Sequence, residues 1–320
     1  MKILSALVVW LALGLVETAV AQDYPSKAVR IVVPFPPGGV ADVMARTMSP
    51  RLAELWGQSV VIDNRAGANT IIGADHVAKS APDGYTLLLT IDSTVSINPS
   101  LYPKLPYDST KDFAPISLVA LTALVLVAHP SVPVNNVNEL VAYAKSRPGA
   151  LNYASVGTGS PQQLMMEQLK LMTGITAVHV PFKGGSLTLV AMLAGDTQIS
   201  FSGIPTTKGH VMNGKLRALA VSSAKRLSSW PDLPSVGESV PGYDSSLWLG
   251  LLAPAGTPSN VIARVQSDVA KVVRLPAIRE LFDAQGLEPV ANTPEQFAAI
   301  IKADSVKWAK VIKEAGIRAD

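Results

Sequence analysis

The stretch that most constrains the fold is residues 29–42, where a strand, a tight turn and a helix start follow one another directly. Val29–Val33 is β-branched and almost wholly apolar, which is typical of a strand buried on both faces of a parallel sheet. Three prolines end this strand because proline donates no hydrogen bond to a sheet, and the chain turns at the glycine pair 38–39. Apolar residues then recur every three or four positions as far as Leu55, which predicts a helix.

Backbone N–H groups at Gly38, Gly39 and the first helical turn should be free and point into a crevice at the carboxyl end of the strand. The helix dipole favours an anion there. An ordinary loop tightened by glycines explains the same residues equally well. Three further glycine-bearing turns follow predicted strands, at 67–73, 157–160 and 183–185. Four such turns together favour an anion site formed by main-chain N–H groups.

The helix after the third of these turns has a well-defined start. Ser160 is a typical N-cap residue, Pro161 occupies the first helical position, and Gln163 completes a capping-box pattern.

Strands alternate with helices through most of the chain. In the first block, strands are predicted at 59–64 and 85–90, with a helix at 74–79 between them. In the second block, strands at 152–156, 177–180 and 199–201 alternate with helices at 161–174 and 186–194. This alternation predicts an α/β protein in which each domain has a mainly parallel sheet flanked by helices.

Two chain crossings between the domains are expected, near 121–124 and 244–249. The predicted lobes are therefore residues 22–122 plus 247–320, and residues 123–246. Glycine-bearing loops from both lobes would face each other across a cleft.

Residues 1–21 read as a secretory signal peptide, with Lys2, an apolar run and the small-residue site Ala19-Val20-Ala21. Removal after about Ala21 would give an exported protein. The absence of cysteine excludes disulfides and a lipidated cysteine anchor. The net charge is only +3 and the basic residues are dispersed, so we expect no nucleic-acid partner.

Catalytic and metal-binding sets are hard to assemble from this sequence. The four histidines are far apart, without helical metal-ligand spacing, and no Gly-x-Ser-x-Gly elbow, Walker loop or complete dinucleotide-binding fingerprint is present. We therefore expect no enzyme activity, no metal and no cofactor. His179 is expected in the core, Asp92 is expected to cap a loop, and Trp248 fits either the core or the cleft wall.

The chain resembles the substrate-binding proteins of tripartite tricarboxylate transporters, known as the Bug family. The segments that carry the resemblance span the whole mature chain: 29–39 with Asp42, 64–68, 72–74, 82–87, 98–102, 105–108, 179–184, 217–221 and 254–258. The resemblance implies a two-lobed periplasmic binding protein of type II, the Venus-flytrap fold, that closes on a small organic carboxylate. It also implies delivery of that ligand to the membrane permease subunits of a tripartite transporter, and we expect a monomer.

The family's ligand-binding positions transfer to this chain as Phe35, Gly39, Ala41 and Asp42 in the first lobe and Thr158, Gly159, Ser160 and His179 in the second. We add to the candidate site Pro37, Gly38, Val40, Ser93 and Ser202.

Two departures from the family pattern bear on the ligand. Asn69-Thr70 replaces a common glycine pair, and Ser202 stands where many members carry Asp after Phe201. Ser202 cannot offer a charge to a ligand ammonium group, so the expected ligand is a non-amino mono- or dicarboxylate, aliphatic or aromatic. The alternatives are a secreted α/β hydrolase acting on a small ester or acid, and a binding lobe that serves a sensor.

Overall fold

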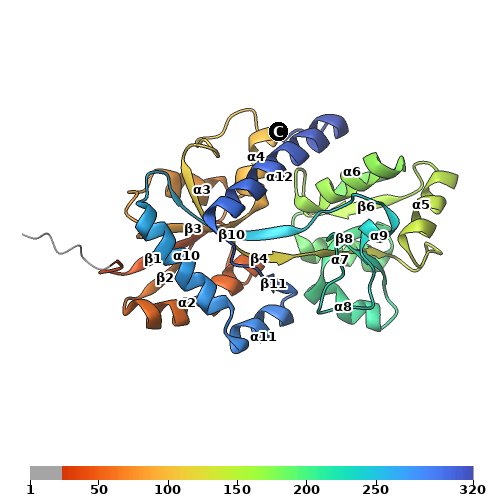
Figure 1. Ribbon diagram of the computed structural model, residues 1–320. Coiled ribbons are helices and arrows are strands. Elements are labelled where there is room, and N and C mark those ends of the chain that lie inside the picture. The colour runs from red at the N-terminus through yellow and green to blue at the C-terminus, as the bar shows by residue number, and fades with distance from the viewer. Residues whose placement is uncertain (1–23, 320) are drawn as a thin grey trace, which may run out of the picture.

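Two α/β lobes lie side by side in the computed structural model, which describes residues 24–319 (Figure 1). The predicted signal peptide lies outside the described residues. The first lobe contains β1 (Val29–Val33), α2 (Val40–Trp56), β2 (Val60–Asn64), α3 (Ile71–Ala78), β3 (Thr86–Ile91), the π-helix η1 (Ser93–Ile97), α4 (Asn98–Leu101), β4 (Phe113–Thr122), β10 (Leu247–Pro254), α10 (Ser259–Val273), α11 (Pro276–Ala284), β11 (Leu287–Pro289) and α12 (Pro294–Ala315). The second lobe contains β5 (Leu124–Ala128), α5 (Val137–Ser146), β6 (Asn152–Ser155), α6 (Pro161–Thr173), β7 (Val178–Pro181), α7 (Gly185–Ala194), β8 (Ile199–Gly203), α8 (Ile204–Met212), β9 (Arg217–Val221) and α9 (Val236–Ser239).

Each lobe is organised around one sheet. The strand order is β11-β4-β10-β3-β1-β2 in the first lobe and β7-β6-β8-β5-β9 in the second. In the first sheet β1 is parallel to β2 and β3, whereas β10 is antiparallel to β3 and β4. In the second sheet β6 is parallel to β7 and β8, whereas β5 is antiparallel to β8 and β9.

Both sheets are therefore mixed: most strands of each sheet run in one direction, and β10 and β11 in the first sheet and β5 in the second run against it. The cause is the way the chain passes between the lobes. Strand β4 leads out of the first lobe and β10 leads back, so these neighbours run in opposite directions. Strand β5 starts where β8 ends, because Leu124 pairs with Gly203. The α/β, two-lobed fold class itself is confirmed.

Only Ala123 separates β4 in the first sheet from β5 in the second. The chain returns to the first sheet where β10 begins, at Leu247. We keep 22–122 with 247–320, and 123–246, as the proposed limits of the two lobes. Within residues 24–319 we find no helix with both the length and the apolar character that crossing a bilayer requires.

Strand β1 is buried on both faces, as its β-branched sequence predicts. Ile31 packs in a core with α2 and α10, and Val32 packs on the opposite side of the sheet with Trp248 and Phe297. The Trp248 and Phe297 rings meet edge to face with their centroids 5.0 Å apart. Trp248 is 1% exposed, so it belongs to the core and not to the cleft wall.

A separate apolar cluster joins the two lobes. Leu164 of α6 is completely buried against side chains of the first lobe, which are Ile97, Leu101, Trp308, Val311 and Ile312. Helices α6 and α12 contact each other across the lobe boundary, and Figure 1 shows them on the same side of the molecule. The lobes are thus held together by packed side chains as well as by the connecting strands.

Two segments for which no helix was predicted are helical. The polar segment after β3 forms η1 and α4, and all five residues of η1 are buried. Helix α8 begins directly after β8, where the sequence suggested only a strand end, and Pro205 lies in its first turn. Proline is favoured at such a position, so Pro205 was an available signal. Burial of η1 beneath α12 depends on residues more than 200 positions away and left no local signal.

Replacing Leu164 with Ala tests the interlobe cluster. A fully buried leucine loses about 2 to 5 kcal/mol of unfolding free energy on truncation to alanine. We expect a loss in this range from urea denaturation. Leu171, on the same helix but 42% exposed, provides the matched control, and Leu171→Ala should change the unfolding free energy by less than about 0.5 kcal/mol. Equal effects of the two substitutions would contradict the packing described here.

Candidate functional site

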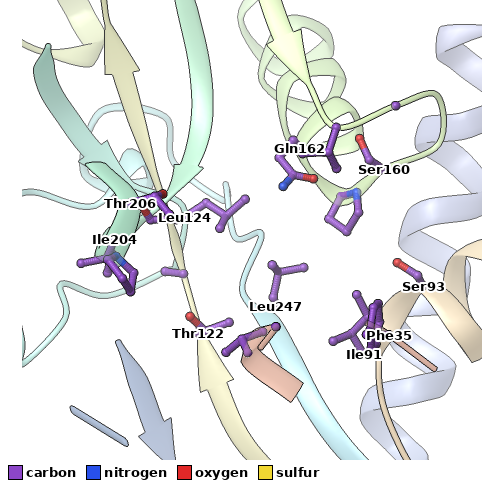
Figure 2. A pocket seen from close by; sticks show the side chains of 18 of the residues that line it. Phe35, Ile91, Ser93, Thr122, Leu124, Ser160, Gln162, Ile204, Thr206 and Leu247 are labelled. Carbon is purple, nitrogen blue, oxygen red and sulfur yellow. Dashed lines mark hydrogen bonds between the residues drawn. The ribbon is translucent and has the colours of Figure 1, made fainter. Parts of the chain in front are cut away.

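A cavity of about 750 Å³ lies between the lobes (Figure 2). The first lobe and the crossing segments contribute Phe35, Gly38, Gly39, Val40, Asn69, Ile91, Ser93, Thr122, Ala123, Leu247 and Gln285. The second lobe contributes Leu124, Val156, Gly157, Thr158, Ser160, Pro161, Gln162, Gly203, Ile204, Pro205 and Thr206. None of these residues has an ionisable side chain. Any charge on a bound molecule would therefore be stabilised by neutral donors and helix dipoles.

The Pro36–Gly39 turn brings the start of α2 to the cavity. The first hydrogen bond of α2 runs from the Val43 N–H to the Gly39 carbonyl, so the N–H groups of Val40 and Ala41 have no partner within the helix. Gly38 differs from the prediction, because its N–H is not free: it donates to the Asp42 carboxylate at 2.9 Å. The helix start therefore offers fewer donors than expected.

Asp42 stabilises this turn instead of facing the cavity. It is 2% exposed, and its carboxylate accepts hydrogen bonds from Arg46 and Asn64 as well as from Gly38. Burial alone would raise the pKa of Asp42, but these hydrogen bonds hold it below the ordinary value. Its neighbour Ala41 is also buried, and Pro37 is exposed; none of these three residues lines the cavity.

Ser93 combines burial with an unused hydroxyl. The residue is 1% exposed and lines the cavity, and its Oγ has no hydrogen-bond partner among residues 24–319. Figure 2 shows this hydroxyl at the cavity, at the start of η1. Single-turn π-helices occur frequently at functional sites. A buried, unpartnered hydroxyl is costly unless a ligand or water completes its hydrogen bonding.

Asp92, immediately before Ser93, does not cap the loop as predicted. It is completely buried, and neither carboxylate oxygen accepts a hydrogen bond that would cap η1 or α4. Burial and the nearby Asp304 carboxylate raise the pKa of Asp92 to about 8, although Lys307 opposes the shift. This shift favours the neutral form of Asp92 at neutral pH.

Asn69 is a lining residue that the site prediction omitted. Ala68, Asn69 and Thr70 have φ of 45°, 48° and 76°, which are left-handed conformations that favour glycine. The glycine pair common in the family would suit this backbone. Here Asn98 holds the turn, because its amide donates to the Asn69 carbonyl and its side-chain oxygen accepts from the Asn69 amide, both at 2.8 Å. The replacement of the family's glycine pair by Asn69-Thr70 was the sequence signal that could have identified Asn69 as a site residue.

The second-lobe turn at 157–160 lies at the start of α6. Ser160 accepts a hydrogen bond from the Gln163 N–H, which confirms it as the N-cap. The Gln163 side chain, however, accepts from the Gly159 N–H at 2.7 Å, one residue before the position that a capping box requires. Gly159 packs against Leu101 of the first lobe and does not line the cavity. Thr158 and Ser160 do line it.

His179 lies behind the second-lobe turn and not at the cavity. Its ring stacks on Tyr153 at a centroid distance of 4.9 Å, and Nε2 lies 2.6 Å from the Ser155 hydroxyl. Burial lowers the pKa of His179. Ser155 is completely buried and does not line the cavity, so this serine–histidine pair is not placed to attack a bound ester. No site of three or more His, Cys, Asp or Glu side chains suited to a metal occurs among residues 24–319.

The predicted site residues thus divide into two groups. Seven line the cavity, namely Phe35, Gly38, Gly39, Val40, Ser93, Thr158 and Ser160. Six lie outside its lining, namely Pro37, Ala41, Asp42, Gly159, His179 and Ser202. Ser202 is half-buried and donates to the Ser200 hydroxyl within β8. Which of the first group contact a ligand remains a prediction.

Two α/β lobes around an interlobe cavity define a periplasmic solute-binding protein. The structure superposes with a TM-score of 0.81 on the R. palustris protein Rpa4515 with adipate, at 35% identity, covering 92% of this chain and 99% of that one. It matches MatC from Rhodopseudomonas palustris with bound malate at a TM-score of 0.76 and 29% identity, covering 90% of this chain and all of that one.

The sequence comparison gives the family. Residues 44–317 match the tripartite tricarboxylate transporter family receptor, TctC, and the chain belongs to this family. It is 37% identical to BugT of Bordetella pertussis over 95% of this chain and 94% of that protein. The resemblance to the Bug proteins found in the sequence is confirmed.

Asp92→Asn tests the burial of this carboxyl group. The folded protein keeps the Asp92 proton up to about pH 8, whereas the unfolded chain releases it near the ordinary pKa of 3.8. The wild-type protein should therefore lose stability relative to Asp92→Asn as the pH rises from about 4 to about 8, with a constant difference above this range. Urea denaturation of both proteins across that interval measures the effect.

Asp283→Asn, at an exposed position of α11, is the control. It should differ from the wild type by a small amount that does not grow over the same pH interval. A pH-independent difference between Asp92→Asn and the wild type would show that Asp92 is ionised throughout, contrary to the environment described here.

Proposed function

We propose that the protein captures a small organic carboxylate in the interlobe cavity and delivers it to the membrane subunits of a tripartite transporter. The observation that carries the proposal is the Ser93 hydroxyl, which is buried, unpartnered and directed to a cavity without charged side chains. A carboxylate accepts hydrogen bonds through both oxygens, so it matches the free donors of this site.

Backbone groups support the same proposal from both lobes. Helix α2 begins at the cavity with unpaired N–H groups at Val40 and Ala41, and α6 begins there beside Thr158 and Ser160. The positive ends of two helix dipoles thus converge on the space that Ser93 faces. The relatives observed with adipate and with malate support a carboxylate ligand for this chain as well.

Ligand contacts from both lobes would favour the closed arrangement, and the membrane subunits would recognise that form. The ligand leaves chemically unchanged in this scheme, and the receptor acts in the periplasm as a monomer. A hydrolase acting on a small ester or acid, or a sensor lobe, would use the same cavity differently and is distinguished by experiment.

The direct experiment measures the melting temperature of the mature protein with a panel of mono- and dicarboxylic acids, followed by calorimetry with those that stabilise it. An acid that binds the folded state alone raises the melting temperature with concentration. The acid should be recovered unmodified by NMR. Its conversion would favour the hydrolase, and stabilisation by none of the acids would overturn the proposal. Release of the acid to vesicles that contain the cognate permease would separate transport from sensing.

Ser93→Ala should weaken binding of every acid that stabilises the wild type. Loss of a hydrogen bond to a charged group costs about 1.5 to 3 kcal/mol, which corresponds to a roughly 10- to 150-fold rise in Kd. Isothermal titration calorimetry measures the change. Ser100→Ala, at an exposed position of α4, is the control and should leave Kd unchanged. An unchanged Kd for Ser93→Ala would remove Ser93 from the site.

Gly39→Val should abolish binding while leaving the fold intact. The backbone at Gly39 has φ −74° and ψ 164°, which any residue adopts, and a Cβ there would be 3.6 Å from the Pro36 carbonyl oxygen, an ordinary contact. The added side chain would occupy the cavity space beside the α2 N–H groups. We expect at least a tenfold rise in Kd with little change in melting temperature.

Gly209→Val provides the matched glycine control, because Gly209 lies on α8 with open space around it and outside the cavity lining. It should bind like the wild type. Wild-type affinity in Gly39→Val would mean that the ligand does not approach the start of α2.

A further inference from the structure

The two ends of the cavity differ in chemistry. Figure 2 shows Ser93, Ser160 and Gln162 on one side of the space, and Leu124 and Ile204 on the other. The first group is polar and adjoins the starts of α2 and α6. The second group lies at the crossing between the lobes and is apolar. We name these regions the donor end and the apolar end of the cavity.

The donor end suits one carboxylate. The Ser93 hydroxyl and the first N–H groups of α2 lack protein partners there. The Gln162 side-chain oxygen also lacks a hydrogen-bond partner although it is buried, and it could accept from a ligand hydroxyl or a bridging water. A single anionic group would accept from these first-lobe donors.

The apolar end offers no charged side chain to a second charged group. Leu124, Ile204 and Leu247 are each less than 9% exposed and contribute aliphatic side chains to the lining. Both side-chain hydroxyl groups in this region already donate hydrogen bonds to backbone carbonyl groups. Thr122 donates to the Gly286 carbonyl at 3.0 Å, and Thr206 donates to the Gly203 carbonyl at 2.9 Å.

Helix α8 begins at the apolar end, so its first N–H groups need separate consideration. Pro205 lies in the first turn of α8 and has no N–H, which removes one of the donors that a helix start would present. Gln285 also lines the cavity in this region, and its side-chain amide carries no charge. The apolar end thus lacks a cation and a free side-chain hydroxyl proton, and its remaining donors are the neutral Ile204 and Thr206 N–H groups at the start of α8 and the Gln285 amide.

We infer that the ligand is a monocarboxylate with an apolar body, in preference to a dicarboxylate or an amino acid. The inference rests on the proposed function and narrows its ligand class. The carboxylate would bind at the donor end, and the hydrocarbon part would pack against Leu124, Ile204 and Leu247. Burying a second carboxylate or an ammonium group beside these side chains is costly without an opposite charge, whereas burying methylene or aromatic carbon is favourable.

Three linear six-carbon acids differ only in the group at the end opposite their shared carboxylate, so comparing them tests what that end of the cavity accepts. Hexanoate, adipate and 6-aminohexanoate share one carboxylate and the chain length, and they end in a methyl, a carboxylate and an ammonium group. Benzoate and terephthalate form the corresponding aromatic pair. Calorimetry at pH 7 should give hexanoate at least tenfold tighter binding than either of its polar-ended analogues, and benzoate at least tenfold tighter binding than terephthalate.

Failure of the inference and failure of the proposed function give different results. Tighter binding of adipate than hexanoate, or of terephthalate than benzoate, would overturn the inference and leave carboxylate capture intact. Tightest binding of 6-aminohexanoate would likewise overturn it. Binding of none of the five acids would count against the proposed function and the inference together.

A charge introduced at the apolar end tests the orientation of the ligand. Thr206→Lys adds an ammonium group at an exposed lining position of α8, and it should raise the affinity for adipate relative to hexanoate by at least tenfold. Met212→Lys adds the same charge to the same helix at a position that is 77% exposed and outside the lining, and should leave the ratio unchanged. An unchanged ratio in Thr206→Lys would contradict placement of the hydrocarbon part at this end.

Discussion

Backbone N–H groups left unpaired at helix starts are the constraint on which the site depends. Strands β1, β3, β6 and β8 end at the cavity, and α2, η1, α6 and α8 begin there, so both lobes direct partial positive charge into one space. Asp42 is part of this arrangement although it faces away from the cavity: it ties Gly38 to Arg46 and Asn64 and so fixes the start of α2. A neutral cavity can hold an anion only if such donors are fixed before the ligand arrives.

Packing between the lobes holds these donors opposite one another. Leu164 of α6 enters an apolar cluster of the first lobe, and Leu101 lies against Gly159 in the second-lobe turn. The same region buries η1, which presents Ser93 to the cavity and places Asp92 beneath α12. Burial and the nearby Asp304 carboxylate raise the pKa of Asp92, which favours its neutral form in this layer. Interlobe packing and ligand capture are therefore parts of one structure: the elements that join the lobes also shape the site.

Local sequence signals predicted the elements but not the use of each polar group. The β-branched run of β1, the prolines and glycines after it, and the Ser160 cap identified the strand-turn-helix units correctly, since these signals act within a few residues. The N–H groups of Gly38 and Gly159 were misjudged because side chains four residues later accept from them. Ser93 could be proposed from its place after a strand, whereas its burial and unpaired hydroxyl depend on distant residues. Mixed sheets, too, follow from how the chain crosses between lobes, which no single segment reveals.

A crystal structure of the protein with hexanoate is the most direct measurement of how the anion is bound. The predicted result is a carboxylate between the lobes, with an oxygen within about 3.2 Å of the Ser93 hydroxyl and of a backbone N–H at the start of α2. The hydrocarbon chain should extend toward Leu124 and Ile204. A carboxylate paired with a lysine or arginine side chain, or bound outside the interlobe cavity, would contradict a site built from neutral donors.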